Sequence, residues 1–297
     1  MKSVIVGKNI TKKYKDFKLD VPEIEIPEGF ATALIGENGA GKTTLLNALA
    51  GIRLDYKGEF TFFEQFNDKD RENSPEVRER IGYTGTENYF LPHWTVDQIR
   101  EIQKLIFSKY DDKEFLRRYD ELAISASGRY AGNKKFSSFS DGTKTKLMLA
   151  SILARDTDLL IMDEPASPLD PLMRDKLCEL ISDYISSKEG RTVFFSTHNI
   201  SDMENVTDYA IIMEHGEIVE RGFVEDLKEK YLLVKGEPED ADAAKKILYT
   251  FSNSKYGFEG ICLAEDLDKL AGMDITTETA SLFQISVAIM KKNSRIK

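Results

Sequence analysis

The stretch Leu34-Ile35-Gly36-Glu37-Asn38-Gly39-Ala40-Gly41-Lys42-Thr43-Thr44 decides how this chain folds. It has the spacing G-x-x-x-x-G-K-T, follows the apolar run 30–35 and precedes the helix-like run 45–50. The order strand, glycine-rich loop, helix is the context in which this spacing forms a phosphate-binding loop. Glycines let backbone N–H groups approach a ligand closely, and a helix N-terminus favours an anion. Residues 36–44 are therefore predicted to cradle phosphate groups.

Two side chains of this loop suit a bound triphosphate. Lys42 is predicted to reach the β- and γ-phosphates, and the Thr43 hydroxyl to coordinate Mg²⁺. A chance glycine turn is the alternative interpretation. The in-phase residues Lys-Thr-Thr and the correct flanks on both sides favour the phosphate loop.

The composition limits the function classes. The chain has 297 residues, 41% of them hydrophobic and 31% charged, which is enough for one large domain and a smaller one. A net charge of −10 leaves no basic excess to neutralise phosphates, so nucleic acid is not expected as a partner. Cys178 and Cys262 lack metal-binding spacing, and we expect two buried thiols in a reducing cytosol. We expect neither a membrane-spanning segment nor a signal peptide.

Two adjacent carboxylates end a second apolar run. Residues 159–162 (LLIM) fit a buried parallel strand, and Asp163 and Glu164 follow directly. In an open α/β sheet, ligands gather at the carboxyl ends of strands. Strand alternation points the two side chains in different directions, so one is predicted to bind Mg²⁺ and the other to face an attacking water. A surface acidic turn is the alternative.

Three further positions are candidates for contact with the ligand. His198 follows the predicted strand 192–196 and points to the same sheet edge. Ser140, Asp141 and Gly142 form a second Ser/Gly loop before the helical run 144–154, where a phosphate contact or a simple helix cap is expected. Tyr14 lies between two predicted strands and either stacks on a base or is a half-exposed strand-end tyrosine.

The remaining pattern gives a coarse element map. Residues 71–80 read as a charged connection, and Thr95 as the N-cap of a mostly helical stretch up to about 123. The other expected strands are 4–10, 17–26, 30–35, 58–63 and 81–83, with a closing hairpin at 209–213 and 217–219.

The order of these motifs resembles the ATP-binding cassette (ABC) ATPases, the motor subunits of ABC transporters. GENGAGKTT resembles their Walker A motif, FSDGT their signature LSGGQ, and LLIMDEP their Walker B motif with its catalytic glutamate. ASPLDP resembles the D-loop and STH the switch-histidine loop. Tyr14 falls where the family has its A-loop aromatic, which favours the stacking role. The resemblance covers residues 1–225.

The resemblance implies an α/β fold, a P-loop NTPase of the ABC type. Its parts are a RecA-like parallel sheet core, an antiparallel β subdomain and a helical subdomain at about 88–155. It also implies an ATPase that forms a head-to-tail sandwich dimer, with an identical copy or with a second, different cassette. ATP and Mg²⁺ would lie between Lys42, Thr43 and Asp163 of one copy and Ser140 with Gly142 of the other.

The same resemblance assigns the remaining roles. Glu164 would polarise the attacking water, His198 would contact the γ-phosphate, and Asp170 would lie across the dimer interface. Phosphoryl transfer to water depends mostly on positioning and on charge neutralisation.

Departures from the family pattern concern two loops. The signature has Asp141 where glycine is common and Thr143 where glutamine is common. A carboxylate beside a triphosphate is unfavourable unless it turns away or pairs with a cation, and Lys144 and Lys146 are the candidates. In the Q-loop, Thr86 takes the place of the glutamine and is expected to bond a water on Mg²⁺, with Glu87 as a possible substitute.

A single cassette without a membrane segment implies a separate integral membrane permease. The protein would then be cytoplasmic and peripheral to the cytoplasmic face of the membrane. A permease helix is expected to dock in the groove beside 86–94, with Phe90 and Trp94 as exposed anchors or, alternatively, packed inside the helical subdomain.

Residues 226–297 are predicted to form a small α+β accessory domain. Strands are expected at 231–235 and 256–263, and helices at 240–250, 264–270 and 280–290. The ending ASLFQISVAIM resembles the tail of lone-cassette subunits of bacterial drug, peptide and antibiotic-resistance exporters, which favours export. From its position, this domain is expected to support the dimer or to regulate it. A non-transport ATP-binding regulatory or clamp module is the alternative function.

Overall fold

The computed structural model describes residues 2–85, 90–125 and 127–293. Its centre is a six-stranded sheet of order β10-β9-β3-β8-β7-β6, in which all neighbours are parallel except the antiparallel pair β9–β10. The strands are β3 (Ala31–Ile35), β6 (Ile81–Thr84), β7 (Leu159–Met162), β8 (Thr192–Thr197), β9 (Tyr209–Glu214) and β10 (Glu217–Phe223). Every residue of β3, β7 and β8 is buried, as expected for parallel strands covered on both faces.

An antiparallel sheet covers one side of the phosphate-loop helix. Its order is β2-β1-β4-β5, with β1 (Ser3–Lys13), β2 (Lys18–Pro27), β4 (Lys57–Phe62) and β5 (Phe66–Asn67). Apolar side chains of β1, β2 and β4 share one core cluster with helix α1 (Lys42–Leu49). This packing fixes α1, and therefore the loop that precedes it, against the main sheet.

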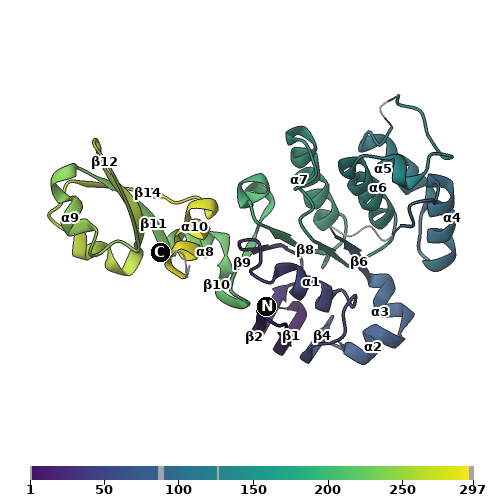
Figure 1. Ribbon diagram of the computed structural model, residues 1–297, viewed down its shortest axis with the longest axis horizontal. Helices are drawn as coiled ribbons and strands as arrows, with labels where there is room; N and C mark the ends of the chain where they lie inside the picture. Colours follow the sequence, from purple (N-terminus) through teal and green to yellow (C-terminus); the bar gives the residue numbers. More distant parts are fainter. Residues whose placement is uncertain (1, 86–89, 126, 294–297) are drawn as a thin grey trace.

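The helical subdomain lies at one end of the molecule (Figure 1). It contains α4 (Val96–Ile106), α5 (Asp112–Glu121) and α6 (Asp141–Leu153). Thr95 caps α4 as predicted, in a capping box with Gln98. The stretch predicted to be mostly helical up to about 123 consists of two helices, because α4 ends at Ile106 and Asp111 caps the start of α5.

The charged segment 71–80 is also more ordered than predicted. It belongs to two short helices, α2 (Asp68–Asn73) and α3 (Pro75–Arg80). Asn67 forms a capping box with Asp70, and Pro75 occupies the first turn of α3, where a missing N–H costs nothing. A proline between charged residues therefore starts a helix here.

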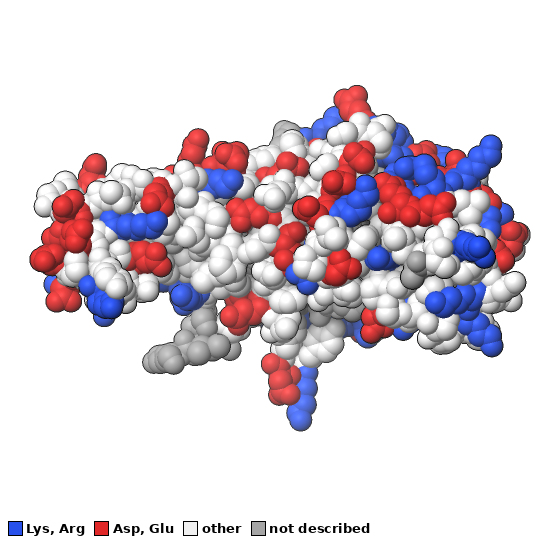
Figure 2. All heavy atoms as spheres, turned by 90° about the horizontal axis from the view of Figure 1, so that it is seen from above, with Lys and Arg blue, Asp and Glu red and all other residues white. Residues whose placement is uncertain are grey.

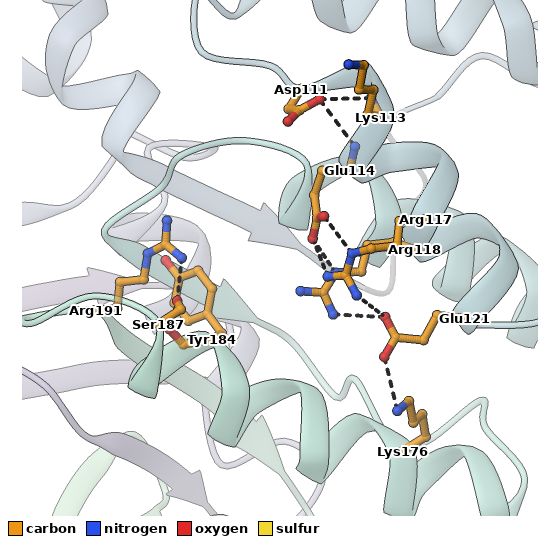
Figure 3. Close-up of polar contacts among 10 residues, drawn as sticks. All are labelled: Asp111, Lys113, Glu114, Arg117, Arg118, Glu121, Lys176, Tyr184, Ser187 and Arg191. Carbon is orange, nitrogen blue, oxygen red and sulfur yellow. Dashed lines mark hydrogen bonds and ion pairs between the residues drawn. The ribbon is translucent and has the colours of Figure 1, made fainter.

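A network of ion pairs on α5 is joined to helix α7 (Pro171–Ser186) of the core through one lysine. Figure 3 shows Arg117 and Arg118 of α5 between Glu114 and Glu121, and Lys176 of α7 reaching Glu121 at 3.0 Å. Hydrogen bonding from Arg117 lowers the pKa of Glu114. Exposed ion pairs contribute little to stability individually, and their contribution becomes significant only when several form a network. Acidic and basic side chains are interspersed over the face seen in Figure 2.

The C-terminal lobe extends from the β10 edge of the main sheet (Figure 1). Its sheet has the order β12-β13-β11-β14, with β11 (Tyr231–Gly236), β12 (Thr250–Ser254), β13 (Gly257–Leu263) and β14 (Ile275–Thr279). Only β11 and β13 were predicted, because β12 and β14 are polar edge strands without apolar alternation. The helix expected at 240–250 is the single turn α9 (Ala241–Ala244), and 264–270 is a 3-10 helix.

The last helix returns to the main core. Helix α10 (Leu282–Asn293) packs against β9 and α8 (Val224–Lys230), and Leu282 and Ile285 are fully buried in the main cluster. Glu204, in the turn that follows the switch loop, accepts a hydrogen bond from the Leu282 N–H at 2.8 Å. The lobe is thus attached to the cassette through both α8 and α10.

Two smaller expectations concern cysteines and membranes. Cys262 is buried and Cys178 is half-buried, both as free thiols, and burial raises the pKa of Cys178 to about 11. In the part of the chain that the structure describes, no helix has both the length and the apolar character needed to cross a bilayer.

A buried arginine holds the C-terminal end of α1. Arg71 is 2% exposed; it donates to the carbonyl oxygens of Ala48 and Leu49 and pairs with Asp68 at 3.0 Å. We expect Arg71→Met to lower the free energy of unfolding by about 3 kcal/mol, because it leaves a carboxylate and helix carbonyls without their cation. Denaturant titration measures this loss.

Arg117→Met is the matched control, since Arg117 is half-exposed and paired only at the surface. Its expected cost is at most about 1 kcal/mol. Equal losses for the two variants would contradict the structural role given to Arg71.

Candidate nucleotide-binding and hydrolysis site

The phosphate loop occupies the turn between β3 and α1. Gly39 and Gly41 have φ of +87° and +109°, in the left-handed region that glycine adopts readily. A Cβ on Gly36 would lie 2.3 Å from the Met213 carbonyl oxygen of β9. The loop therefore depends on glycine both for its conformation and for its close approach to the sheet.

Lys42 lies inside this loop and is 5% exposed. Its Nζ donates to the carbonyl oxygens of Gly36 at 2.7 Å and Glu37 at 3.2 Å, and lies 3.4 Å from Glu164 Oε1. A buried ammonium needs such partners, and phosphate oxygens would supply stronger ones. The contact of Lys42 with phosphates stays a prediction.

Thr43 and Asp163 form the candidate Mg²⁺ position. The Thr43 hydroxyl donates to Asp163 Oδ2 at 2.9 Å, and Asp163 is 3% exposed. These oxygens fit Mg²⁺, which prefers hard ligands and is often held by one or two protein groups plus substrate phosphates. Among the described residues no cluster of three or more His, Cys, Asp or Glu side chains could hold a metal alone. Bound here, the ion would neutralise charge on the phosphates.

Glu164 and His198 lie beside this position. Oε2 of Glu164 is 2.7 Å from Nδ1 of His198, and a carboxylate only accepts, so Nδ1 carries the proton. Glu164 has φ of +51°, an uncommon conformation for a residue with a side chain. Its N–H donates to the Ser196 hydroxyl at 3.0 Å. The site thus contains a carboxylate held between a lysine and a histidine.

Ser196 is a site residue that the sequence did not reveal. The motif STH drew attention to its histidine, whereas a serine inside an apolar strand resembles ordinary core. The parallel register, in which Met162 pairs with Phe195, sets Ser196 beside Asp163. The proximity of Ser196 to Asp163 follows from the order of the strands in the sheet, which the sequence motifs do not give.

Comparison with known proteins identifies the family. The family model described as "ABC transporter" matches residues 19–167. The chain belongs to this family. It is 32% identical to the ABC transporter ATP-binding protein MJ1023 of Methanocaldococcus jannaschii, over 77% of this chain and 81% of that protein. It is 31% identical to the energy-coupling factor transporter ATP-binding protein EcfA2 of Clostridioides difficile, over 72% and 77% respectively. It is therefore an ABC ATPase.

Further comparisons extend this result. The methionine import ATP-binding protein MetN of Campylobacter jejuni is 30% identical, over 74% of this chain and 70% of that protein. The ATP binding subunit of an ABC transporter superposes with a TM-score of 0.64 at 22% identity, over 76% of this chain and 92% of that one. The dimeric cassette MJ0796 with ADP and Pi superposes with a TM-score of 0.59 at 21% sequence identity, over 74% of this chain and 98% of that one. The predicted ABC-type P-loop fold is confirmed.

The segment that resembles the family signature, Ser140 to Gly142, begins helix α6. Ser140 caps the helix by accepting the Thr143 N–H at 3.3 Å. Asp141 pairs with Lys144 at 2.9 Å, one of its two predicted partners, and its side chain is 86% exposed. A Cβ on Gly142 would lie 2.7 Å from the Pro168 carbonyl oxygen. The described contacts of Ser140, Asp141 and Gly142 are therefore with helix α6 and with Pro168 of the D-loop. They lie apart from the Lys42 network, which is Lys42 with Gly36, Glu37 and Glu164.

The other predicted site positions have different outcomes. Asp170 caps α7, accepting the Met173 N–H at 3.1 Å. Thr86 and Glu87 lie outside the described residues, so their roles stay predictions. Of the two interpretations of Phe90, packing inside the helical subdomain is correct: Phe90 is 3% exposed and packs edge-on against Phe136, with ring centroids 5.5 Å apart. Trp94 is partly buried against the same core.

Burial also affects a carboxyl group next to the loop. Glu214, the last residue of β9, is 4% exposed. Burial and then the charge of Glu37 raise the pKa of Glu214.

Tyr14 lies near the phosphate loop, with the side chain of Phe17 between its ring and Gly41. Its ring lies 6.1 Å from that of Phe17, and a Cβ on Gly41 would lie 2.8 Å from Phe17 Cζ. Tyr14 itself is 38% exposed, so its ring has a free surface.

We expect Tyr14→Ala to weaken ATP binding by about tenfold, since one base stacked on an aromatic ring contributes roughly 1–3 kcal/mol. Tyr14→Phe retains the π-face and should bind ATP like the wild type. Titration with a fluorescent ATP analogue measures both. Wild-type affinity in the alanine variant would rule out stacking.

Proposed function

We propose that this ABC ATPase is the motor subunit of a transporter, binding ATP with Mg²⁺ and driving a separate membrane permease. The observation that carries this proposal is the convergence of Lys42, Thr43, Asp163, Glu164 and His198, from three segments of the chain, at one end of the main sheet. Together they supply a phosphate contact, a metal position, a carboxylate for water and a histidine.

The chemistry is ATP and water to ADP and phosphate. Lys42 pairs with Glu164 in the structure, and a triphosphate would compete for the lysine. Glu164, released from that ion pair but still held by His198, then orients the attacking water. Lys42 and the metal would stabilise the charge on the transferred phosphoryl group, which is the main requirement of this reaction.

The proposal includes a head-to-tail dimer with an identical or a second cassette. Ser140 and Gly142 of one copy would complete the site of the other, with Asp170 at the interface. Support comes from the position of this segment outside its own Lys42 network and from the dimeric form named for the MJ0796 cassette.

A groove between the core and the helical subdomain is the proposed permease site. It has a volume of about 730 Å³, and its lining combines apolar side chains such as Trp94, Ile102 and Ile106 with polar ones such as Arg78 and Glu79. Ile106 is 60% exposed, and Leu105 next to it 85%. Exposed apolar surface of this kind suits an amphipathic helix. Docking here would hold the protein at the cytoplasmic face of the membrane.

Export is the finer part of the proposal. It rests on the resemblance of residues 280–290 to the tails of lone-cassette exporters. The relatives include a protein named for methionine import, so the cassette itself does not set the direction. We also propose residues 1–225 as the ATPase domain and 226–297 as an accessory domain that regulates or supports the dimer. The contact between Glu204 and α10, close to the switch loop, supports a regulatory role.

Glu164→Gln tests the motor function. Loss of the carboxylate should slow hydrolysis at least about 100-fold. With ATP and Mg²⁺, light scattering should show the variant trapped at twice the monomer mass. Glu189→Gln, a change at an exposed carboxylate, should hydrolyse ATP like the wild type.

The outcomes separate the alternatives. Unchanged hydrolysis in Glu164→Gln would remove its catalytic assignment. A wild type that binds ATP without hydrolysing or dimerising would overturn the homodimeric motor and favour either a second cassette or a regulatory module.

Ile106→Glu tests the groove. A charge in the proposed contact should lower the membrane-bound share of the protein at least about tenfold in cells that produce it, as for an interface hot spot. ATP hydrolysis by the purified chain should not change. Tyr256→Glu, on a hairpin tip where Tyr256 is 80% exposed, is the control. An unchanged membrane fraction in Ile106→Glu would exclude this groove.

A further inference from the structure

Ser196 is a fully buried polar side chain in the middle of the site, with 0% exposure. It lies on β8, two residues before His198. Its hydroxyl donates to Asp163 Oδ1 at 2.5 Å and accepts the Glu164 N–H at 3.0 Å. One hydroxyl therefore connects the candidate metal ligand with the backbone of the candidate catalytic carboxylate.

The two oxygens of Asp163 have different partners. Oδ2 accepts from the Thr43 hydroxyl at 2.9 Å, whereas Oδ1 accepts from Ser196. A metal ion at this position would compete for Oδ2 and for the Thr43 oxygen, since both are hard ligands. The bond from Ser196 to Oδ1 can persist through that exchange. It fixes the rotation of the carboxylate about its Cβ–Cγ bond while the other oxygen changes partner.

The second bond acts on Glu164. This residue has φ of +51°, in the left-handed region, which persists only where surrounding contacts support it. The Ser196 oxygen accepts the N–H of this residue. The backbone conformation sets the direction of the side chain toward Lys42 and His198. Hydrogen bonds in series, from N–H to hydroxyl to carboxylate, also strengthen one another.

We infer that Ser196 is a positioning residue that orients Asp163 for the metal and Glu164 for the attacking water. This inference rests on the proposed ATPase site. Because Ser196 is fully buried and its hydroxyl bonds Asp163 and the Glu164 N–H, we expect its effect to pass through these two carboxylate residues.

Ser196→Ala removes both hydrogen bonds, and Ser196→Thr restores the hydroxyl. Ser151→Ala is the matched control, because Ser151 is also fully buried and its hydroxyl bonds the Leu147 carbonyl oxygen within α6, away from both carboxylates. Each full-length variant is titrated with Mn²⁺ and a non-hydrolysable ATP analogue, with free Mn²⁺ followed by paramagnetic resonance. Binding of a fluorescent ATP analogue in EDTA, the thermal midpoint, kcat and KM are also measured.

In Ser196→Ala we expect the Mn²⁺ half-saturation to rise, and kcat to fall, by about tenfold or more, as for other residues that orient a metal ligand. Nucleotide binding in EDTA should change less than about twofold, because the phosphate loop is intact. Ser196→Thr should recover most of the loss, and Ser151→Ala should match the wild type.

Wild-type Mn²⁺ binding and kcat in Ser196→Ala would overturn the inference. The inference would also be overturned if Ser151→Ala lost Mn²⁺ binding and kcat to the same extent. The same holds if the loss in Ser196→Ala were matched by a lower thermal midpoint and weaker nucleotide binding in EDTA. If Ser196→Ala does not fold, Ser196→Cys, of similar volume and a weaker donor, is read in the same titration. A wild type without hydrolysis would end the proposed function, while the Mn²⁺ titrations would still decide the role of Ser196.

Discussion

Strand β8 lies between β3 and β7 in the main sheet, and the site depends on this order. The phosphate loop follows β3, the two carboxylates follow β7, and the histidine follows β8. Since all three strands are parallel, their carboxyl ends meet at the same edge. Thr43 and Asp163, 120 residues apart in the chain, thus join Ser196 in one hydrogen-bonded group. A different strand order would separate the same motifs.

Charge balance explains the arrangement inside that group. Lys42 is a buried cation that is compensated by two carbonyl oxygens and the Glu164 carboxylate. Glu164 is compensated in turn by Lys42 and His198. Such a chain of partners compensates each buried charge, and each partner can be exchanged for a phosphate or a metal.

Sequence predicted the parts of the fold that depend on local chemistry. The phosphate loop, the buried strand before Asp163 and the Thr95 cap are each encoded by a few adjacent residues, and the structure contains all three. Prediction failed where tertiary context decides. The edge strands β12 and β14 are polar and are held by their neighbours. The sequence leaves open whether Phe90 is exposed or packed, because Phe136, against which it packs, lies 46 positions away in the chain. Ser196 resembles an ordinary strand residue in the sequence, because its hydrogen-bond partners Asp163 and Glu164 follow a different strand, β7.

The return of α10 to the main core affects how the protein can be made. Residues 282–293 cover part of β9, a strand beside the one that carries the phosphate loop, although they come after the whole C-terminal lobe. During synthesis the strands of the main sheet leave the ribosome first. The apolar surface around β9 therefore stays exposed until α10 has been synthesised and packs against it. The lobe in between must fold without blocking that return. Cotranslational folding of this ABC ATPase is therefore not strictly sequential, since its main core is completed by residues 282–293.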